Sequence, residues 1–288
     1  MSGVLYRYAA FTTTPDGGNP AGIWIGDTHP SDAEMQRIAT DVAYPETIFV
    51  APADGLERKA RYFSPTKEMD FCGHATIATG VLFGSMAGAG EYRVSTKVGI
   101  VPLSVREQGD RWQAALTSVT PKHEKAPPQL LREVLAALRW REDELDPAIG
   151  PARIFAGNWH LLIAARTAAR LAALDYDFER MKSLMLADNL ATLQLVWRER
   201  PDLYHARDPF ASGGIVEDPA TGSAVAAFAG VVAASGLADG RHAIAIEQGY
   251  EMGRPSLLHL GLTMAAGALA GASVGGDAVI VGEGAIEA

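Results

Sequence analysis

Two short segments without a polar face constrain the fold of this chain more than any other feature. Residues 75–83 and 224–234 contain only Ala, Gly, Thr and larger apolar residues. This composition predicts two helices, and a helix that is apolar all round must be buried. Short predicted strands precede and follow both segments, so we expect a curved sheet to enclose the helix in the first half. The predicted fold class is α+β.

The two helices begin in matched surroundings. Cys72-Gly73-His74-Ala75 and Thr221-Gly222-Ser223-Ala224 lie 149 residues apart, and each connects a strand end to one of the apolar helices. This match indicates that the two halves repeat one plan. A length of 288 residues also favours two domains of similar size. The charged, proline-bearing residues 122–128 suit a linker between them.

Composition excludes several classes of function. The formal net charge of -9 argues against a nucleic-acid partner, because phosphate binding needs a basic surface. A single cysteine, Cys72, rules out an internal disulfide and a cysteine-rich metal site. The first residues lack the pattern of a signal peptide, and the longest apolar stretches are too short or too rich in Gly and Ala to span a membrane. We therefore expect a soluble, cytoplasmic protein.

The two helix starts are candidate anion sites. A helix start presents unpaired N–H groups and the positive end of the helix dipole, and a glycine there lets a ligand approach the backbone. Gly73 and Gly222 could thus hold a substrate carboxylate without any Arg or Lys. The alternative for each is an ordinary turn glycine, but their matched context favours function.

Polar side chains beside these turns are candidate substrate contacts. His74 could be a core histidine, Asp218 a helix N-cap and Ser223 a first-turn residue without a role. Taken together on paired turns, the three become plausible members of one site.

Two further residues are candidate acid/base groups. Cys72 precedes a helix, where a thiolate is stabilised, although free cysteines are often buried and inert. Its counterpart is Thr221, so a racemisation mechanism with two cysteines is excluded. Glu46 lies among Tyr44, Pro45 and an apolar strand, where partial desolvation would suit proton transfer near neutral pH. The alternative is an exposed loop glutamate.

Six motifs together resemble the PhzF-like (phenazine-biosynthesis-like) family. They occur in the family's order and span nearly the whole chain. They are Gly18-Asn19-Pro20-Ala21-Gly22, Pro45-Glu46-Thr47-Ile48-Phe49, Arg61-Tyr62-Phe63-Ser64-Pro65, Cys72-Gly73-His74-Ala75-Thr76, Asp218-Pro219-Ala220-Thr221-Gly222-Ser223-Ala224, and Gln248-Gly249 with Met252-Gly253-Arg254-Pro255-Ser256.

The resemblance implies a diaminopimelate-epimerase-like fold. In that fold two pseudo-repeated domains each form a barrel-like, mostly antiparallel sheet around a central helix, with the active site in the cleft between them. We accordingly expect an N-terminal domain over residues 1–120, completed by a strand near 277–288, and a C-terminal domain over 121–276. Members of the family are often homodimers.

The resemblance also implies a reaction. The family's best-known member isomerises trans-2,3-dihydro-3-hydroxyanthranilate by a proton shift, without a metal or an organic cofactor. Its catalytic glutamate corresponds to Glu46, and its supporting residues correspond to His74, Asp218 and Ser223. The remaining candidates for substrate binding are Asn19, Cys72, Gly73, Thr221 and Gly222.

Two alternatives stay open. The first is an epimerase or racemase that uses Cys72 and Glu46 as its two bases. The second is a non-catalytic protein that binds a small carboxylated molecule. A pure binding protein, however, has no need for an acid/base residue such as Glu46.

Overall fold

The computed structural model describes residues 3–238 and 240–282, which form two compact units. The described residues up to Thr117, with those from Gly275 onward, make up the first unit, and Ser118–Val274 make up the second. Both units combine strands and helices, so the prediction of an α+β fold is confirmed. In this part of the chain no helix is long and apolar enough to cross a membrane.

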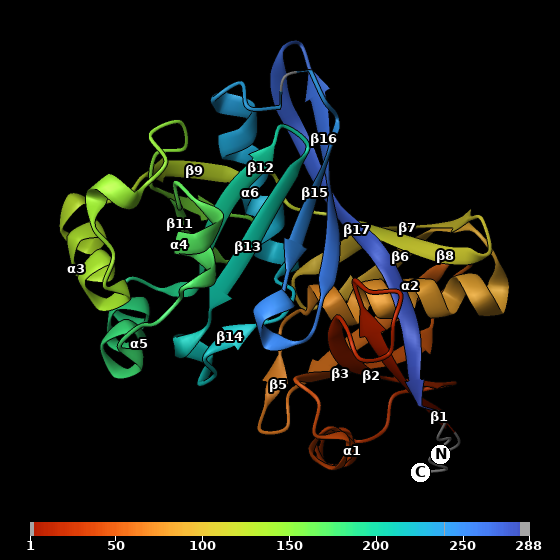
Figure 1. Cartoon of the computed structure of the whole chain (residues 1–288). Helices are drawn as coiled ribbons and strands as arrows, with labels where there is room; N and C mark the ends of the chain where they lie inside the picture. Colours follow the sequence, from red (N-terminus) through yellow and green to blue (C-terminus); the bar gives the residue numbers. More distant parts are fainter. Residues whose placement is uncertain (1–2, 239, 283–288) are drawn as a thin grey trace. The chain divides into compact units, whose positions relative to one another are not determined.

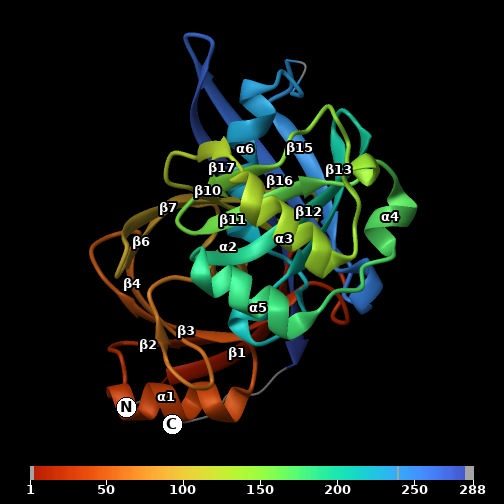
Figure 2. The same cartoon turned by 90° about the vertical axis from the view of Figure 1, so that its left-hand side faces the viewer.

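The first unit is a closed barrel around a helix (Figures 1 and 2). Eight strands pair in a ring, in the order β1-β2-β3-β4-β6-β7-β8-β17 and back to β1. The strands of the ring are β1 (Gly3–Ala10), β2 (Asn19–Gly26), β3 (Glu46–Pro52), β4 (Glu57–Phe63), β6 (Gly90–Thr96), β7 (Gly99–Gln108), β8 (Arg111–Thr117) and β17 (Ala268–Gly282). A two-residue strand, β5 (Glu68–Met69), pairs with the end of β4.

Helix α2 (Gly73–Ala87) fills the interior of this barrel. It packs against β1, β2, β3, β7 and β8, and every side chain from His74 to Gly84 is buried. A Cβ atom added at Gly80 would lie 2.6 Å from the Cβ of Ala114 on β8, so the small residues of the helix let the strands approach it. The prediction of a buried helix is confirmed, although the helix extends beyond residues 75–83 at both ends.

Helix α1 (Asp32–Val42) covers the outer face of the same sheet. Its Met35, Ile38, Ala39 and Val42 pack against side chains from β1, β2, β3 and β4, including Trp24. Ser31 caps the helix, since its hydroxyl accepts a hydrogen bond from the Glu34 N–H at 3.3 Å. Strand β3 is therefore buried on both faces, which holds its first residue, Glu46, in place.

The second unit repeats the same order of strand pairings. Its strands are β9 (Lys122–Lys125), β10 (Ala152–Phe155), β11 (Trp159–Ala164), β12 (Leu190–Arg200), β13 (Leu203–Pro209), β14 (Glu217–Asp218), β15 (Ala243–Gln248) and β16 (Ser256–Ala265). The antiparallel pair β10–β11, parallel β11–β12, antiparallel β12–β13 and parallel β13–β15 match β1–β2, β2–β3, β3–β4 and β4–β6. The pairing of β13 with β14 matches that of β4 with β5.

The helices of the second unit follow this plan as well. Helix α6 (Gly222–Ala234) packs against β9, β10, β11 and β16, and its residues from Ala224 to Val232 are buried. Helices α3 (Pro128–Leu138), α4 (Ala168–Ala172) and α5 (Phe178–Ala187) share a hydrophobic core with β11 and β12. Short 3-10 turns occur at Glu142–Glu144, Ala211–Gly213 and Tyr250–Met252. The second predicted buried helix is thus also confirmed.

The predicted linker over residues 122–128 is wrong in its first part. Lys122–Lys125 form β9, which pairs antiparallel with β10. All four residues of β9 are exposed, so their charged side chains stay in water while the backbone completes a strand pair. A strand of this kind shows no alternation of apolar and polar residues, and composition alone makes it resemble a loop.

Candidate active site

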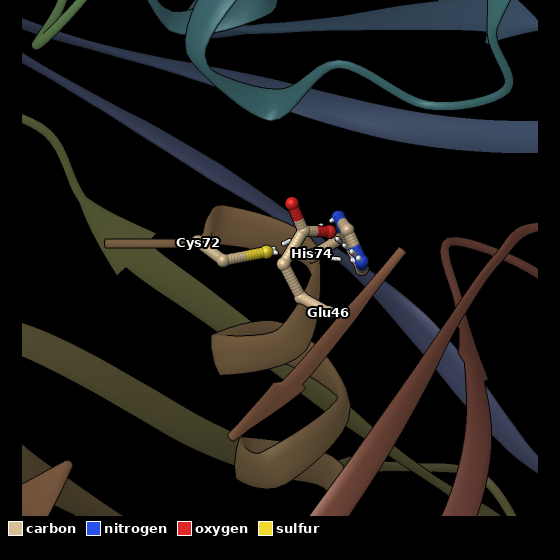
Figure 3. Close-up of side chains that lie close together, drawn as sticks. All are labelled: Glu46, Cys72 and His74. Atoms are coloured by element: carbon tan, nitrogen blue, oxygen red, sulfur yellow. Dashed lines mark hydrogen bonds and ion pairs between the residues drawn. The ribbon is translucent and has the colours of Figure 1, made fainter. Parts of the chain in front are cut away.

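Three candidate residues of the first unit meet at the start of α2 (Figure 3). Glu46 begins β3, Cys72 is the N-cap residue of α2, and His74 is the second residue of that helix. The Glu46 Oε2 atom lies 3.4 Å from His74 Nε2, and Cys72 Sγ lies 3.3 Å from His74 Nδ1. Residues 28 positions apart in the sequence (46 and 74) are therefore brought into contact by the barrel.

Burial decides the charge of His74. Its side chain is buried, and this burial lowers its pKa to about 4, against a smaller raising effect of a hydrogen bond to the Pro20 carbonyl. The imidazole is therefore neutral near pH 7, and its contact with Glu46 is not an ion pair there. A neutral imidazole has one N–H donor and one acceptor nitrogen, which suits it to orient a carboxyl group or pass on a proton.

The side chain of Glu46 is mostly enclosed, with 19% of it exposed. The alternative of an exposed loop glutamate is therefore wrong, because the residue starts a strand that is buried on both faces. Its carboxyl group retains an accessible edge and faces a helix N-terminus, where backbone N–H groups are available to an anion.

Gly73 and Asn19, the other predicted substrate-binding residues of this unit, differ in their surroundings. Gly73 is the first residue of α2, and a Cβ atom added there would meet only Leu116, at 3.8 Å. Packing does not require a glycine at this position, which leaves space beside the first turn of the helix. Asn19 is fully buried at the start of β2, one residue before the Pro20 that contacts His74.

The candidates of the second unit surround the start of α6. Thr221 is the N-cap residue, Gly222 begins the helix, and Ser223 lies half-buried in its first turn. Asp218 ends β14, and its Oδ2 atom accepts a hydrogen bond from the Thr221 hydroxyl at 2.6 Å. The alternative of Asp218 as the N-cap is wrong, because Thr221 occupies that position.

One residue that holds this turn, Gln248, was not among the predicted site residues. Gln248, at the end of β15, donates through Nε2 to the Asp218 carbonyl at 2.8 Å. Its Oε1 atom accepts from the Thr221 N–H at 3.2 Å. Gln248 is fully buried and binds both sides of the turn, so it fixes the backbone from Asp218 to Thr221. The Gln248-Gly249 motif was its only sequence signal.

The cluster in the first unit also has a spacing that would suit a metal ion. One ligand atom from each of Glu46, Cys72 and His74 lies within 4.8 Å of the other two. A carboxylate, a thiolate and a neutral imidazole are all ligands of zinc. The expectation that the protein works without a metal remains a prediction.

Comparison with known proteins agrees with this architecture. A family profile described as "Phenazine biosynthesis-like protein" matches residues 8–284. An uncharacterized isomerase of Deinococcus radiodurans is 31% identical, over 97% of this chain and 94% of the relative. A trans-2,3-dihydro-3-hydroxyanthranilate isomerase of Pseudomonas chlororaphis is 29% identical, over 96% of both chains.

Solved structures show the same fold. The crystal structure of a PhzF-family protein from Bacillus anthracis has a TM-score of 0.88 and 24% identity, over 100% of both chains. A probable proline racemase from Agrobacterium radiobacter has a TM-score of 0.65 and 14% identity, over 100% of this chain and 93% of that one. Because the family profile covers nearly the whole chain, this protein belongs to the PhzC-PhzF family and is an isomerase of that family.

Proposed function

We propose that this isomerase moves a proton between two carbon atoms of a small carboxylated substrate, with Glu46 as the acid/base residue. The observation that supports it most is the enclosed Glu46 carboxyl group, which lies 3.4 Å from a buried imidazole at the start of α2. A carboxylate in such a place can accept a proton from an acidic C–H bond of the substrate and return it to another carbon of the substrate's conjugated system. No atom is gained or lost.

The other residues of the cluster support this transfer. His74 remains neutral and orients the Glu46 carboxyl group or relays its proton. The N–H groups at the start of α2, next to the open space at Gly73, stabilise the negative charge that develops on the substrate. The resemblance assigns Asp218 and Ser223 supporting roles in the same reaction, and Thr221 and Gly222 are further candidates for substrate binding. Variants of these four residues test both assignments.

The relatives that are trans-2,3-dihydro-3-hydroxyanthranilate isomerases suggest a first compound to assay. Wild-type protein is incubated with trans-2,3-dihydro-3-hydroxyanthranilate in D2O, and deuterium in the product is followed by NMR. Glu46→Gln keeps the shape of the side chain but removes the acid/base group, so turnover should fall by at least about 100-fold. Glu107→Gln makes the same chemical change at an exposed position on β7 and should leave turnover unchanged. A folded, active Glu46→Gln protein would refute the assignment.

A second candidate function rests on Cys72. Its thiol lies 3.3 Å from His74 at the helix start, in the same cluster as Glu46. Cys72 and Glu46 would then act as the two bases of an epimerase. That reaction exchanges deuterium at a stereocentre, and Cys72→Ser would abolish the exchange. If Cys72→Ser retains full turnover, the single-carboxylate mechanism is favoured. If no bound compound exchanges a proton, the protein is a binding protein.

The homodimer implied by the resemblance is also a proposal. Light scattering of the purified protein after size-exclusion chromatography tests it directly. A mass of 30.5 kDa would identify a monomer, and twice that mass would identify the dimer.

A further inference from the structure

A hollow opens at the end of the first barrel, beside the last turn of α2. Its volume is about 520 Å³, which lies within the range of small-molecule sites. The cluster of Glu46, Cys72 and His74 lies at the start of the same helix. Because α2 has 15 residues and rises about 1.5 Å per residue, the two places lie ~20 Å apart. The hollow is therefore separate from the candidate active site.

The walls of the hollow are apolar and come from five elements of the first unit. Strands β1, β2, β3 and β6 and helix α2 contribute Val4, Ile25, Val50, Phe83, Met86 and Tyr92. Val50, Phe83 and Tyr92 are buried, whereas Val4 and Met86 at the rim are 38% and 57% exposed. Apolar walls with an apolar rim suit a ligand that has an apolar body.

Among the described residues that line the hollow, Arg58 of β4 is the one cation. Its guanidinium carbon lies 5.6 Å from the centre of the Phe83 ring and 5.9 Å from that of Tyr92. The two rings are stacked on one another, with their centres 5.0 Å apart. Arg58 Nη1 also donates to the carbonyl oxygens of Gly55 at 2.9 Å and Glu57 at 2.8 Å. Two carbonyls and two rings thus hold the guanidinium in one place.

No carboxylate of the described residues forms an ion pair with Arg58, whose contacts there are these two carbonyls and two rings. Nearby arginines of the same sheet differ in this respect. Arg61 Nε binds Glu68 at 2.8 Å, and Arg93 Nε binds Glu57 at 3.5 Å. The Nε–H and Nη2–H groups of Arg58 form a fork that matches the two oxygens of a carboxylate. The hollow therefore offers an anion partner between apolar walls.

Packing alone explains the place of Arg58 but not the space beside it. A guanidinium over aromatic rings is favoured by cation–π attraction, and a cation near the end of a helix is favoured by the helix dipole. Both interactions would be kept if a bulky side chain filled the hollow. The lining instead includes the small residues Ala51 and Ala87, which leave the space open.

The other charged residue of the lining is Asp27, which follows β2 and is exposed. It forms no ion pair with Arg58, so the two opposite charges act on a ligand from different sides. The negative charge of Asp27 repels a ligand that carries two or more negative charges, such as a phosphate monoester or a dicarboxylate. A single carboxylate bound to Arg58 experiences the least repulsion. The lining therefore favours a monocarboxylate.

We propose that this hollow is a binding site for a small monocarboxylic acid with an apolar body. The carboxylate binds the Nε–H and Nη2–H groups of Arg58, and the apolar body packs against Ile25, Val50 and Met86. The site does not include Glu46, so the proposal goes beyond the proposed function and does not depend on it. The first unit then has a place for a carboxylated molecule at each end of α2.

NMR of methionine methyl groups tests the site with 1-naphthoate as the probe. In protein labelled with [13C-methyl]methionine, Met86→Leu identifies the signal of Met86, which lines the hollow. This signal should shift in a saturable way with 1-naphthoate. The affinity for 1-naphthylmethanol, which has the same rings but no charge, should be about tenfold lower or less. Glu46→Gln should give the same Met86 result, so failure of the proposed function would leave it intact.

Substitutions in the lining test the role of each charge. Arg58→Gln should weaken binding of 1-naphthoate by about tenfold or more. Arg106→Gln makes the same change at an arginine of β7 that is 78% exposed and should leave the affinity unchanged. Asp27→Asn removes a repulsive charge and should tighten binding by about twofold. Ala87→Trp fills the hollow from an exposed position while keeping Arg58, and it should also weaken binding by about tenfold.

Three results would overturn the proposal. The first is a Met86 signal that 1-naphthoate does not shift, and the second is equal affinity for 1-naphthoate and 1-naphthylmethanol. The third is an Arg58→Gln protein that binds 1-naphthoate as tightly as wild type. If Arg58→Gln does not fold, Ala87→Trp decides instead, since unchanged affinity in that variant would place the probe outside the hollow.

Discussion

Asp208 on β13 is fully buried opposite Asp218 on β14, and its raised pKa has a thermodynamic consequence that Asp208→Asn should reveal. In the folded chain, the pKa of this group is held well above its ordinary value by burial and, to a smaller extent, by the negative charges of Asp218 and Glu217. In the unfolded chain the same group ionises near its ordinary pKa of about 3.9. The folded state therefore binds one more proton than the unfolded state over the pH range between those two values. Its contribution to stability is complete below pH ~3.9 and is lost as the pH rises through this range.

The magnitude follows from this difference of one proton. The free energy of unfolding of wild type should fall, relative to Asp208→Asn, by about 1.4 kcal/mol for each pH unit above ~4, as long as Asp208 stays protonated. Between pH 5 and pH 6 the free energy of unfolding of Asp208→Asn should thus rise by about 1.4 kcal/mol relative to that of wild type. The low pKa of His160 also affects stability in this range, but it does so in both proteins and cancels in the difference.

Urea unfolding at pH 5.0, 5.5 and 6.0, followed by tryptophan fluorescence and circular dichroism, measures this difference. Because the chain has two compact units, the comparison uses the transition that the substitution shifts. Asp202→Asn is a matched control, since Asp202 is 51% exposed and paired with Arg200 at 3.0 Å. Its difference from wild type should not vary over the same range. A protonated Asp208 would be refuted if the difference between Asp208→Asn and wild type did not depend on pH. It would also be refuted if the free energy of unfolding of wild type rose relative to that of the variant as pH rises.

Three further predictions concern the first unit and its cluster. Gly80→Ala should destabilise the protein by about 1–3 kcal/mol, because its Cβ would lie 2.6 Å from the Ala114 Cβ. Adding Ala114→Gly should restore most of that loss, and Gly230→Ala in α6 should cost less, since its nearest neighbour is a histidine side chain at 3.1 Å. Denaturant unfolding measures all three. The pKa of about 4 at His74 predicts that His74→Gln leaves the shape of the activity profile unchanged between pH 5 and 8, and a lost titration step there would contradict it. Dialysis against EDTA should not lower turnover, whereas added zinc should inhibit it by binding the cluster, and Cys72→Ser should weaken that inhibition. Equal zinc sensitivity of the two proteins would exclude the thiol as a ligand.

Features set by local composition could be predicted from the sequence. The two buried helices follow from the absence of a polar face, and the matched turns before them indicated the repeated plan. The contact between Glu46 and His74 required more, because physical reasoning alone left Glu46 either as an acid/base group or as an exposed loop residue. Only the motifs shared with a family singled it out.

Features set by strand register could not be predicted. Asp208 faces Asp218 because β13 and β14 pair with one particular offset, and no local pattern specifies that offset. Gln194 and Thr192, whose side chains hydrogen-bond to Asp208, lie in an apolar run of β12, where single polar residues are easily overlooked. Strand β9 was missed for a different reason, since its four charged, exposed residues have the composition of a loop.

The strand that closes the first barrel comes from a distant part of the chain. Ala278 of β17 pairs with Ala10 of β1, 268 positions earlier (278 − 10). During synthesis on the ribosome, β1 and β8 therefore remain unpaired edges until nearly all of both units has emerged. Domains usually fold in the order in which they are made. Here the unit that is begun first can only be finished last, so its open edges are exposed to chaperones, or to aggregation, for most of translation.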